Sequence, residues 1–384
     1  MKFLHTADWH VGKTLKGRSR LEEQRAVLRE IVDIALRENV DAVLIAGDLY
    51  DSAAPSAEAQ RLVNGALLAL AQAGIEVIVI AGNHDHARTF EALRQLMAVA
   101  GIDYSGMVRT AEEGGVHRFT ARATGEEAVV ALVPFVSRRR ILGTEEIITG
   151  TPSENAGHYE RSVREILATL ARSFTPDTVN IVMAHLTCTG GVMGGGEREA
   201  QSIFEYHVSA QAFPITAHYV ALGHLHRRQQ IPAPVPVVYS GAPVAVDFGE
   251  QENTPVVCLV EASPRTPATI TDIPLTTGKR LRTVTGTVAE LIAARADFGD
   301  DYLRVVVQEP VRAGLRDEVL EALPQALEIR IHPDFAQTRT HRGVQHTTRS
   351  PRDLFAAYCD EAGLQDPRLT ALFSELLDET TGVS

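Results

Sequence analysis

Residues 76–85 read EVIVIAGNHD, an apolar and β-branched run that ends in a polar turn. Such a run, bounded by Gly and Asn, is typical of a buried strand followed by a loop. The same pattern occurs upstream, where the apolar residues 42–46 lead into GDLYD at 47–51. Both runs therefore predict strands whose C-terminal ends carry acidic, amide or imidazole side chains.

Helical periodicity separates these runs, over Leu21–Glu38 and Ser56–Ala73, and a further short strand is expected at Lys2–Thr6. Strands that alternate with helices predict an α/β layered fold. Downstream, a second set of short strand-like segments predicts a second sheet packed on the first, and we expect residues 1–275 to form one domain. These segments are Val129–Val133, Asn180–Ala184, Tyr219–Leu222 and Val237–Tyr239.

The composition changes after Pro274. Residues 279–333 contain three strand-like and two helical segments, which predict a small α/β domain. Residues 337–349, QTRTHRGVQHTTR, are polar and basic and predict a linker. Within residues 350–384, Ser350-Pro351 and Asp366-Pro367 each place Pro after a helix N-cap, so this tail is expected to form two short helices.

The composition excludes several classes of protein. At 45% hydrophobic and 22% charged, the 384 residues can bury a full core. No apolar run reaches the ~18 residues of a membrane span, Asp8 and His10 interrupt any secretory signal, and the three cysteines lack disulfide or zinc spacing. We expect a cytoplasmic protein. The net charge of -12 disfavours a non-specific nucleic-acid coat, but bound cations reverse the local sign of an Asp-rich site.

Five polar clusters each follow an apolar run at its C-terminal end, the edge of an α/β sheet where ligands bind. Taken alone, each cluster is typical of a turn, a cap or a hydrogen-bonded core histidine. Five in succession predict one shared site. The clusters are Asp8-Trp9-His10, Gly47-Asp48, Gly82-Asn83-His84-Asp85, His185 and Gly223-His224-Leu225-His226.

These residue types suit a pair of divalent metal ions. Two ions need one bridging carboxylate, for which Asp48 is the natural candidate, together with imidazole, carboxylate and neutral oxygen ligands. The absence of thiolate and the imidazole-rich set favour Mn²⁺. The remaining ligands are expected to be Asp8, His10 and His226 for one ion, and Asn83, His185 and His224 for the other.

Two divalent metal ions held in this way activate a water molecule for in-line attack on phosphorus. His84 is not needed as a ligand, so we predict that it protonates the leaving oxygen. Asp51, three residues after the bridge, is expected to orient the imidazole of His84 through its carboxylate.

Two basic runs and one glycine-rich run leave alternatives open. Arg138-Arg139-Arg140 and Arg227-Arg228 either contact DNA phosphates or form a solvated surface. Residues 190–196, GGVMGGG, lack the Lys-Ser/Thr of a phosphate-binding P-loop and predict a mobile linker after His185.

In this order, DWH, GDLYD, GNHD, the strand end at His185 and GHLH resemble the calcineurin-like metallophosphoesterase superfamily. Within it, FLHTADWHVGK, AHLTCTGG, YVALGHLHRRQ and YSGAPVAVDFGE are similar to the D subunits (SbcD) of bacterial SbcCD DNA double-strand-break exonucleases. The resemblance implies a four-layer sandwich of two mixed sheets flanked by helices. It also implies a manganese-dependent exonuclease with endonuclease activity on DNA ends or hairpins, which acts in DNA repair, recombination and replication.

The resemblance further implies that residues 279–333 cap the site and position DNA. It implies a homodimer through the helices at Ala57–Ala71 and Phe90–Ala98, within a heterotetramer. The tail is expected to dock on the coiled coil of an SbcC-type ATPase subunit through an apolar face made of Leu354, Phe355, Leu369, Leu372, Phe373 and Leu376.

Two other functions remain to be weighed. A small-molecule phosphodiesterase or phosphatase would use the same two-metal core, but it would need neither residues 279–333 nor the tail. A non-catalytic module with this fold would lack several ligands, whereas every expected ligand position and His84 are filled here.

Overall fold

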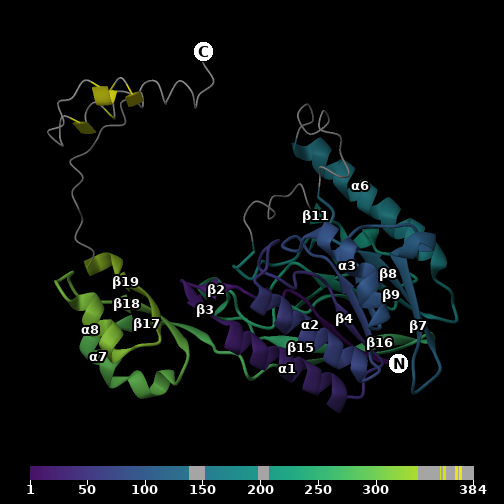
Figure 1. The fold of residues 1–384 in the computed structure, drawn as a ribbon, viewed down its shortest axis with the longest axis horizontal. Helices are drawn as coiled ribbons and strands as arrows, with labels where there is room; N and C mark the ends of the chain where they lie inside the picture. Colours follow the sequence, from purple (N-terminus) through teal and green to yellow (C-terminus); the bar gives the residue numbers. More distant parts are fainter. Residues whose placement is uncertain are drawn as a thin grey trace. The chain divides into compact units, whose positions relative to one another are not determined.

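Most of the apolar runs predicted as strands lie in two six-stranded sheets of the computed structural model (Figure 1). The structure describes residues 1–137, 152–197 and 207–335, and near the C-terminus residues 355, 358–359, 368–370 and 372–373. These divide between two units, Met1–His332 and Pro333–Ser384.

The first sheet is mixed. Its spatial order is β16 (Thr266–Pro274), β15 (Val256–Ser263), β1 (Lys2–Thr6), β4 (Ala42–Ile45), β5 (Glu76–Ile80) and β6 (Ile102–Ser105). The strands β1, β4, β5 and β6 are parallel to one another. β15 is antiparallel to β1, and β16 is antiparallel to β15. The C-terminal ends of β1, β4 and β5 therefore lie at one edge.

The second sheet is also mixed. Its order is β13 (Gln229–Ile231), β14 (Val237–Tyr239), β12 (Tyr219–Gly223), β9 (Val179–His185), β8 (Glu127–Val133) and β7 (Val116–Thr120). The central strands β14, β12, β9 and β8 are parallel, with antiparallel strands at both margins.

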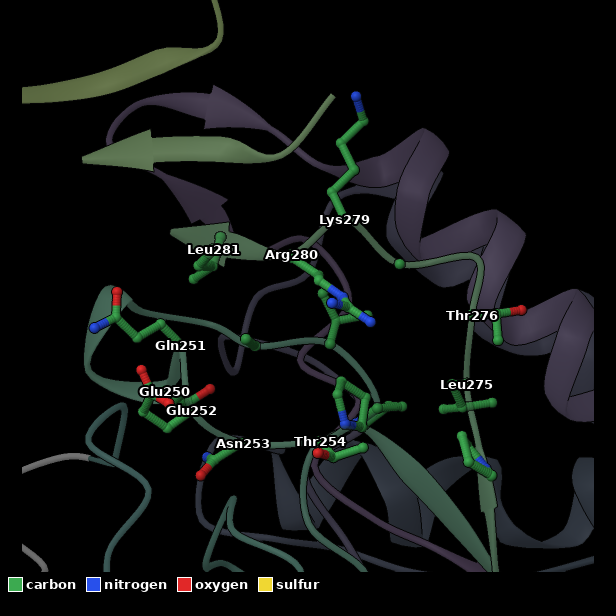
Figure 2. Close-up of a pocket in the computed structure, with 16 residues that line it drawn as sticks. Glu250, Gln251, Glu252, Asn253, Thr254, Leu275, Thr276, Lys279, Arg280 and Leu281 are labelled. Atoms are coloured by element: carbon green, nitrogen blue, oxygen red, sulfur yellow. The ribbon is translucent and has the colours of Figure 1, made fainter. Parts of the chain in front are cut away.

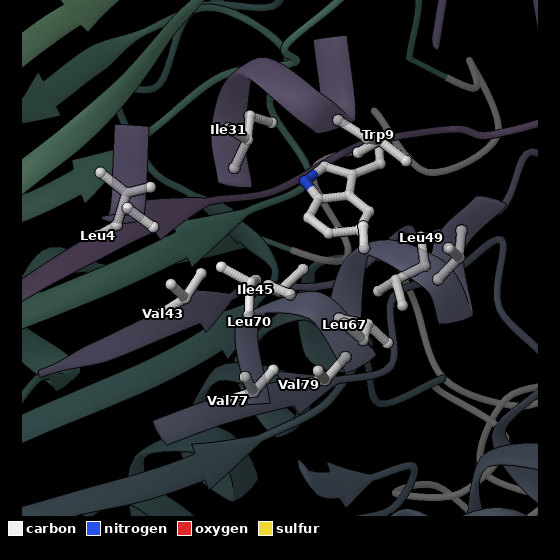
Figure 3. Packing of buried hydrophobic residues seen from close by; sticks show 14 of the residues in the cluster. Leu4, Trp9, Ile31, Val43, Ile45, Leu49, Leu67, Leu70, Val77 and Val79 are labelled. Atoms are coloured by element: carbon white, nitrogen blue, oxygen red, sulfur yellow. The ribbon is translucent and has the colours of Figure 1, made fainter. Parts of the chain in front are cut away.

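Helices cover the outer face of each sheet. The helices on the first sheet are α1 (Leu21–Arg37), α2 (Ala57–Gln72) and α3 (Ala87–Val99), and α6 (Pro152–Leu170) covers the second. Successive residues of β5 alternate between two cores: Val77 and Val79 pack against α2, beside Leu67 and Leu70 (Figure 3), whereas Ile78 lies between the sheets. Both faces of the strand are buried, which explains its unbroken apolar sequence. The resulting helix–sheet–sheet–helix order confirms the predicted four-layer fold.

A third, three-stranded parallel sheet follows the sandwich. Its elements are β17 (Leu281–Gly286), α7 (Val288–Ala293), β18 (Tyr302–Val307), α8 (Leu315–Ala322) and β19 (Ala326–Ile331). They enclose a separate apolar core that includes Leu303, Val305 and Val319. A capping box between Thr287 and Glu290 begins α7. The elements predicted within residues 279–333 are thus present in the predicted order.

Two short ribbons lie outside these sheets: β2 (Thr14–Leu15) pairs with β3 (Arg18–Ser19), and β10 (Thr187–Cys188) with β11 (His207–Val208). The helix α6 was not predicted from the sequence. None of the helices among the described residues is both long and apolar enough to cross a bilayer.

In the second unit, the described tail residues are helical. The ring of Phe355 stacks on that of Phe373 at 4.0 Å, so the two predicted helical segments contact each other. Leu369 and Leu372 are exposed. Of the predicted docking face, Phe355 and Phe373 are therefore engaged within the tail. Leu354, Leu376 and the predicted linker 337–349 lie outside the described residues.

Candidate metal centre

The five predicted clusters meet where the two sheets face each other. β1, β4 and β5 end beside one another in the first sheet, and β9 and β12 do so in the second. Hydrogen bonds join the two edges: His185 Nδ1 donates to Ala46 O at 2.8 Å, and the main-chain N–H of His224 donates to both carboxylate oxygens of Asp8.

The backbone is strained at this edge. Among the described residues, six that are not glycine have positive φ, and four of them are predicted ligands: Asp8, His10, Asp48 and His224. L-residues adopt this conformation at a cost, which the surrounding structure must offset, and such strain concentrates at functional sites. Gly47 has φ +96, and a side chain there would collide with His185. A side chain at Gly82 would collide with Asp48.

One group of predicted ligands consists of Asp8, His10 and His226, which are all buried and close enough together to hold a metal ion. The Nε2 atoms of the two histidines lie 3.0 Å apart. His10 Nδ1 is buried and makes no hydrogen bond.

The second group brings together Asn83, Asp48, His185 and His224. Asn83 Oδ1 lies 2.8 Å from both His185 Nε2 and His224 Nδ1. His185 Nε2 also lies 3.4 Å from Asp48 Oδ2. The same Asp48 oxygen lies 3.8 Å from His10 Nε2, in the first group. Asp48 therefore stands between the two groups.

These donor atoms fit divalent metal ions. A carbonyl can only accept a hydrogen bond, so the bond to Ala46 places the proton of a neutral His185 on Nδ1 and turns the Nε2 lone pair toward Asn83 Oδ1. Metal–ligand bonds near 2.1 Å in an octahedral shell hold neighbouring ligand atoms about 3 Å apart. The spacing between these acceptor atoms, 2.8–3.8 Å, agrees with such a shell.

The charges in the site are strongly coupled. Burial acts to raise the pKa of Asp48, but the imidazoles of His185 and His10 outweigh burial and hold this pKa well below its usual range. Burial conversely disfavours the charged form of His185, yet Asp48 raises its pKa to about 9. Burial raises the pKa of Asp8 to about 7.

Two of the histidines favour the neutral form that a metal ligand needs. Burial and the neighbouring His226 hold the pKa of His10 well below its ordinary value. Burial and His185 lower the pKa of His224 to about 3. These low pKa values favour the free imidazole at neutral pH.

Sequence reasoning missed the carboxylate behind His226. Glu250 is fully buried and accepts a hydrogen bond from His226 Nδ1 at 2.6 Å, while its second oxygen accepts one from Val246 N at 2.7 Å. Although burial opposes it, this carboxylate raises the pKa of His226 to about 9. A carboxylate on the outer nitrogen of a histidine ligand fixes the ring and its tautomer. The sequence feature that could have indicated this role is the position of Glu250 at the end of the mainly apolar segment YSGAPVAVDFGE.

The glycine-rich run 190–196 was predicted to be a mobile linker, and this interpretation is wrong for its last residues. The main-chain N–H groups of Gly194 and Gly195 donate to the carboxylate of Glu197, which also accepts from His226 N. Close approach explains the glycines, since a side chain at Gly196 would collide with Glu250. Gly194, Gly195 and Gly196 are packed against the site, whereas Val192, earlier in the run, is exposed.

Asp85 was also missed, although it belongs to the GNHD cluster. Its buried carboxylate accepts from the main-chain N–H groups of Leu49, Tyr50 and Gly82, and thereby joins the loops after β4 and β5. Burial raises its pKa to about 7.

His84 lies beside the ligands, with its ring centroid 4.6 Å from that of His10. It was predicted to be oriented by the carboxylate of Asp51, and the structure corrects this: His84 Nδ1 donates to the main-chain carbonyl of Asp51 at 2.8 Å. The Asp51 carboxylate lies 4.0 Å from His84 Nδ1 and forms an ion pair with Lys13 at 3.1 Å.

The predicted DNA-contacting arginines differ in their surroundings. Arg227 is exposed. Arg228 donates through Nε to Asp272 at 2.8 Å, so its guanidinium is held by β16 and is less available to a phosphate than predicted. Arg138, Arg139 and Arg140 lie outside the described residues.

Comparison with known proteins agrees with this geometry. Residues 1–228 match the family described as calcineurin-like phosphoesterase, and residues 277–362 match the type 5 capsule protein repressor C-terminal domain.

Three relatives are named as the D subunit of the nuclease SbcCD. The chain is 37% identical to that of Bacillus subtilis, over 73% of this chain and 71% of the relative. It is 33% identical to that of Rhodobacter capsulatus, over 93% of this chain and 94% of the relative. It is 29% identical to that of Escherichia coli K12, over 81% of this chain and 76% of the relative. Among solved structures, the protein TT1561 of Thermus thermophilus aligns over 72% of this chain and 99% of its own, with a TM-score of 0.39 and 14% identity. The chain belongs to the calcineurin-like phosphoesterases and, among them, to the D subunits of SbcCD nucleases.

Proposed function

We propose that this chain is the nuclease subunit of a DNA end-processing complex, and that it hydrolyses phosphodiester bonds at DNA ends or hairpins with two divalent ions, preferably Mn²⁺. The observation that carries the proposal is the position of Asp48 Oδ2, 3.8 Å from His10 Nε2 on one side and 3.4 Å from His185 Nε2 on the other. A carboxylate shared by two imidazole groups is what a bridged ion pair requires.

The chain's own residues would divide the work as follows. Asp8, His10 and His226 would hold one ion, Asn83, His185 and His224 would hold the other, and Asp48 would be shared between them. When bound, the ions supply an activated water and neutralise charge on the phosphate. Four imidazoles in the set suit Mn²⁺ better than Mg²⁺, which prefers oxygen ligands.

His84 is proposed as the proton donor to the leaving oxygen. Because its Nδ1–H is used by the carbonyl of Asp51, the proton that it can deliver is on Nε2. The fixed ring position beside His10 supports this role.

The other proposed functions concern DNA and partners. Arg227 is exposed next to the ligand His226 and is proposed to contact a phosphate, as are Arg138, Arg139 and Arg140. Residues 279–333 are proposed to position DNA.

For the homodimer we propose the exposed faces of α2 and α3, where Leu68, Leu96 and Val99 are partly or largely exposed. For the coiled coil of an SbcC-type ATPase we propose the exposed Leu369 and Leu372 of the tail.

A direct test compares hydrolysis of end-labelled linear duplex DNA with that of a chromogenic phosphodiester, each with Mn²⁺, Mg²⁺ or EDTA. We expect DNA cleavage with Mn²⁺ and none in EDTA. The matched variants are His84→Gln, which should cleave DNA about 10²–10⁴-fold more slowly, and His86→Gln at an exposed position, which should cleave it normally. Efficient hydrolysis of the small substrate without cleavage of DNA would instead identify a small-molecule phosphodiesterase.

A further inference from the structure

Residues 275–279 connect the sandwich to the third sheet, and two glutamates of α1 hold this second linker in place. Glu30 accepts hydrogen bonds from the main-chain and hydroxyl groups of Thr276 and Thr277, at the surface. Glu23 accepts from Lys279 N at 2.8 Å. Among the described residues, the contact of Glu23, and not that of Glu30, continues into the interior through a buried ion pair.

Glu23 and Arg20 form a buried ion pair. Arg20 donates through Nε and Nη2 to the two carboxylate oxygens of Glu23, at 2.8 and 2.6 Å. The Arg20 side chain is 1% exposed and that of Glu23 4%. Burying two charges is costly unless every donor is used, and the remaining nitrogen of Arg20, Nη1, donates to Ala245 O.

The next residues lead directly to a proposed metal ligand. Val246, which follows Ala245, donates its N–H to Glu250 at 2.7 Å, and Glu250 accepts from His226 Nδ1 at 2.6 Å. A path of hydrogen bonds, joined in the middle by the Ala245–Val246 peptide bond, therefore runs from the linker at Lys279 to the imidazole of His226.

The domain itself also contacts this path. Tyr302, the first residue of β18, lies with its ring 5.6 Å from the guanidinium of Arg20, and it is also close to Arg18 and Lys279. Such cation–aromatic contacts are stabilising when they are desolvated, and Tyr302 is 5% exposed. Arg20 thus contacts both the docked domain and the segment that carries Glu250.

A cavity of about 360 Å³ lies on the other side of that segment. Figure 2 shows the loop of Glu250, Gln251 and Glu252 on one wall and Leu275 and Thr276 of the linker on the opposite wall. The loop therefore borders open space on this side, whereas Val246 and Phe248 are buried, and two hydrogen bonds hold the carboxylate of Glu250.

We propose that Arg20 and Glu23 are positioning residues through which docking of the 279–333 domain sets the position of Glu250, and hence the affinity of the site for the metal ion held by His226. The inference rests on the proposed role of His226 as a ligand. When the domain shifts, Glu23 loses its hydrogen bond from Lys279 N, and Arg20 loses its contact with the ring of Tyr302. The Arg20 guanidinium, whose Nη1 donates to Ala245 O, then moves as well.

The test is a Mn²⁺ titration followed by the fluorescence of Trp9, the single tryptophan, which is buried between Asp8 and His10. Glu23→Gln should weaken Mn²⁺ binding by about 2- to 30-fold. Glu30→Gln is the matched control: it is the same substitution on the same helix, against the same linker, but without a path to Ala245. It should leave Mn²⁺ binding unchanged.

Arg20→Lys keeps the buried charge pair but loses the forked contact, so it serves even where Glu23→Gln fails to fold, as checked by circular dichroism. It should weaken Mn²⁺ binding over the same range. On a Glu250→Gln background, neither Glu23→Gln nor Arg20→Lys should have a further effect. Full effects on that background, or equal effects of Glu23→Gln and Glu30→Gln, would overturn the inference.

The same titrations separate this inference from the proposed function. A wild-type chain that binds no Mn²⁺, or a Glu250→Gln variant that binds it normally, contradicts the metal assignment itself. Normal binding by Arg20→Lys beside weakened binding by Glu250→Gln contradicts only the role of Arg20 and Glu23.

Discussion

Glu250→Gln is expected to weaken Mn²⁺ binding while the fold is retained. The Glu250 carboxylate accepts from His226 Nδ1 at 2.6 Å and from Val246 N at 2.7 Å. A glutamine keeps one acceptor oxygen, but its amide N–H would face one of these two donors. The bond to His226 then loses its charge-assisted character.

The size of the effect follows from that bond. A hydrogen bond to a charged group contributes about 1.5–3 kcal/mol, which corresponds to roughly a 10- to 150-fold change in binding. Substitution of the carboxylate behind a metal-bound histidine independently suggests about 10- to 100-fold. We therefore expect the Kd for Mn²⁺ to rise about 10- to 100-fold.

The assay is isothermal titration of metal-free protein with Mn²⁺ at fixed pH, with thermal unfolding as a check on the fold. Glu252→Gln is the control, because Glu252 lies in the same loop, is exposed, and loses the same charge. Equal weakening in both variants would attribute the effect to net charge and refute the argument from the bond to His226.

Three further outcomes are expected. His84→Ala should retain Mn²⁺ and DNA binding but cleave about 10²–10⁴-fold more slowly, and loss of metal would instead make His84 a ligand. Although burial opposes it, Asp103 and Glu76 raise the pKa of His117 from 6.5 to about 9. Because the pKa is higher in the folded state than in the unfolded state, the charged imidazole stabilises the fold by up to about 3 kcal/mol below pH 6.5. This stabilisation is lost as the pH rises through 9. Urea unfolding of wild type and His117→Gln should therefore differ at pH 6 and converge at pH 10, and a constant difference would contradict this. Deletion of residues 350–384 should leave metal content and basal Mn²⁺-dependent cleavage nearly intact but abolish co-purification with the ATPase subunit, whereas a lower melting temperature with normal ATPase binding would make the tail structural.

Much of the fold could be predicted because its signals are local. After Glu76, the strand β5 is apolar on both faces, as expected for a strand that is covered on two sides. Gly82-Asn83 marks the turn that follows it. The positions of the five polar clusters could be predicted for the same reason, since each follows such a strand. Parallel pairing of β1, β4 and β5 then brings three of them to one edge.

The residues that support the proposed ligands could not be predicted in this way. Glu250 acts on His226 across 24 positions of sequence, and only the fold brings them together. Asp51 was assigned by proximity to the bridge, but a carboxylate and a carbonyl of the same residue point in different directions, and the carbonyl is the one that meets His84. The pairing of Arg228 with Asp272 likewise depends on β16 lying at the sheet margin.

The most direct test of the account is anomalous diffraction from crystals grown with Mn²⁺, for the wild-type chain and for Asp48→Ala. A metal pair that shares Asp48 should give two peaks in the wild type, about 3.5–4 Å apart and on either side of the Asp48 carboxylate, because both groups of donor atoms face its Oδ2. In Asp48→Ala, both peaks should be lost or strongly reduced together. Two ions at full occupancy in the variant, or a single ion in the wild type, would contradict the shared-carboxylate metal pair.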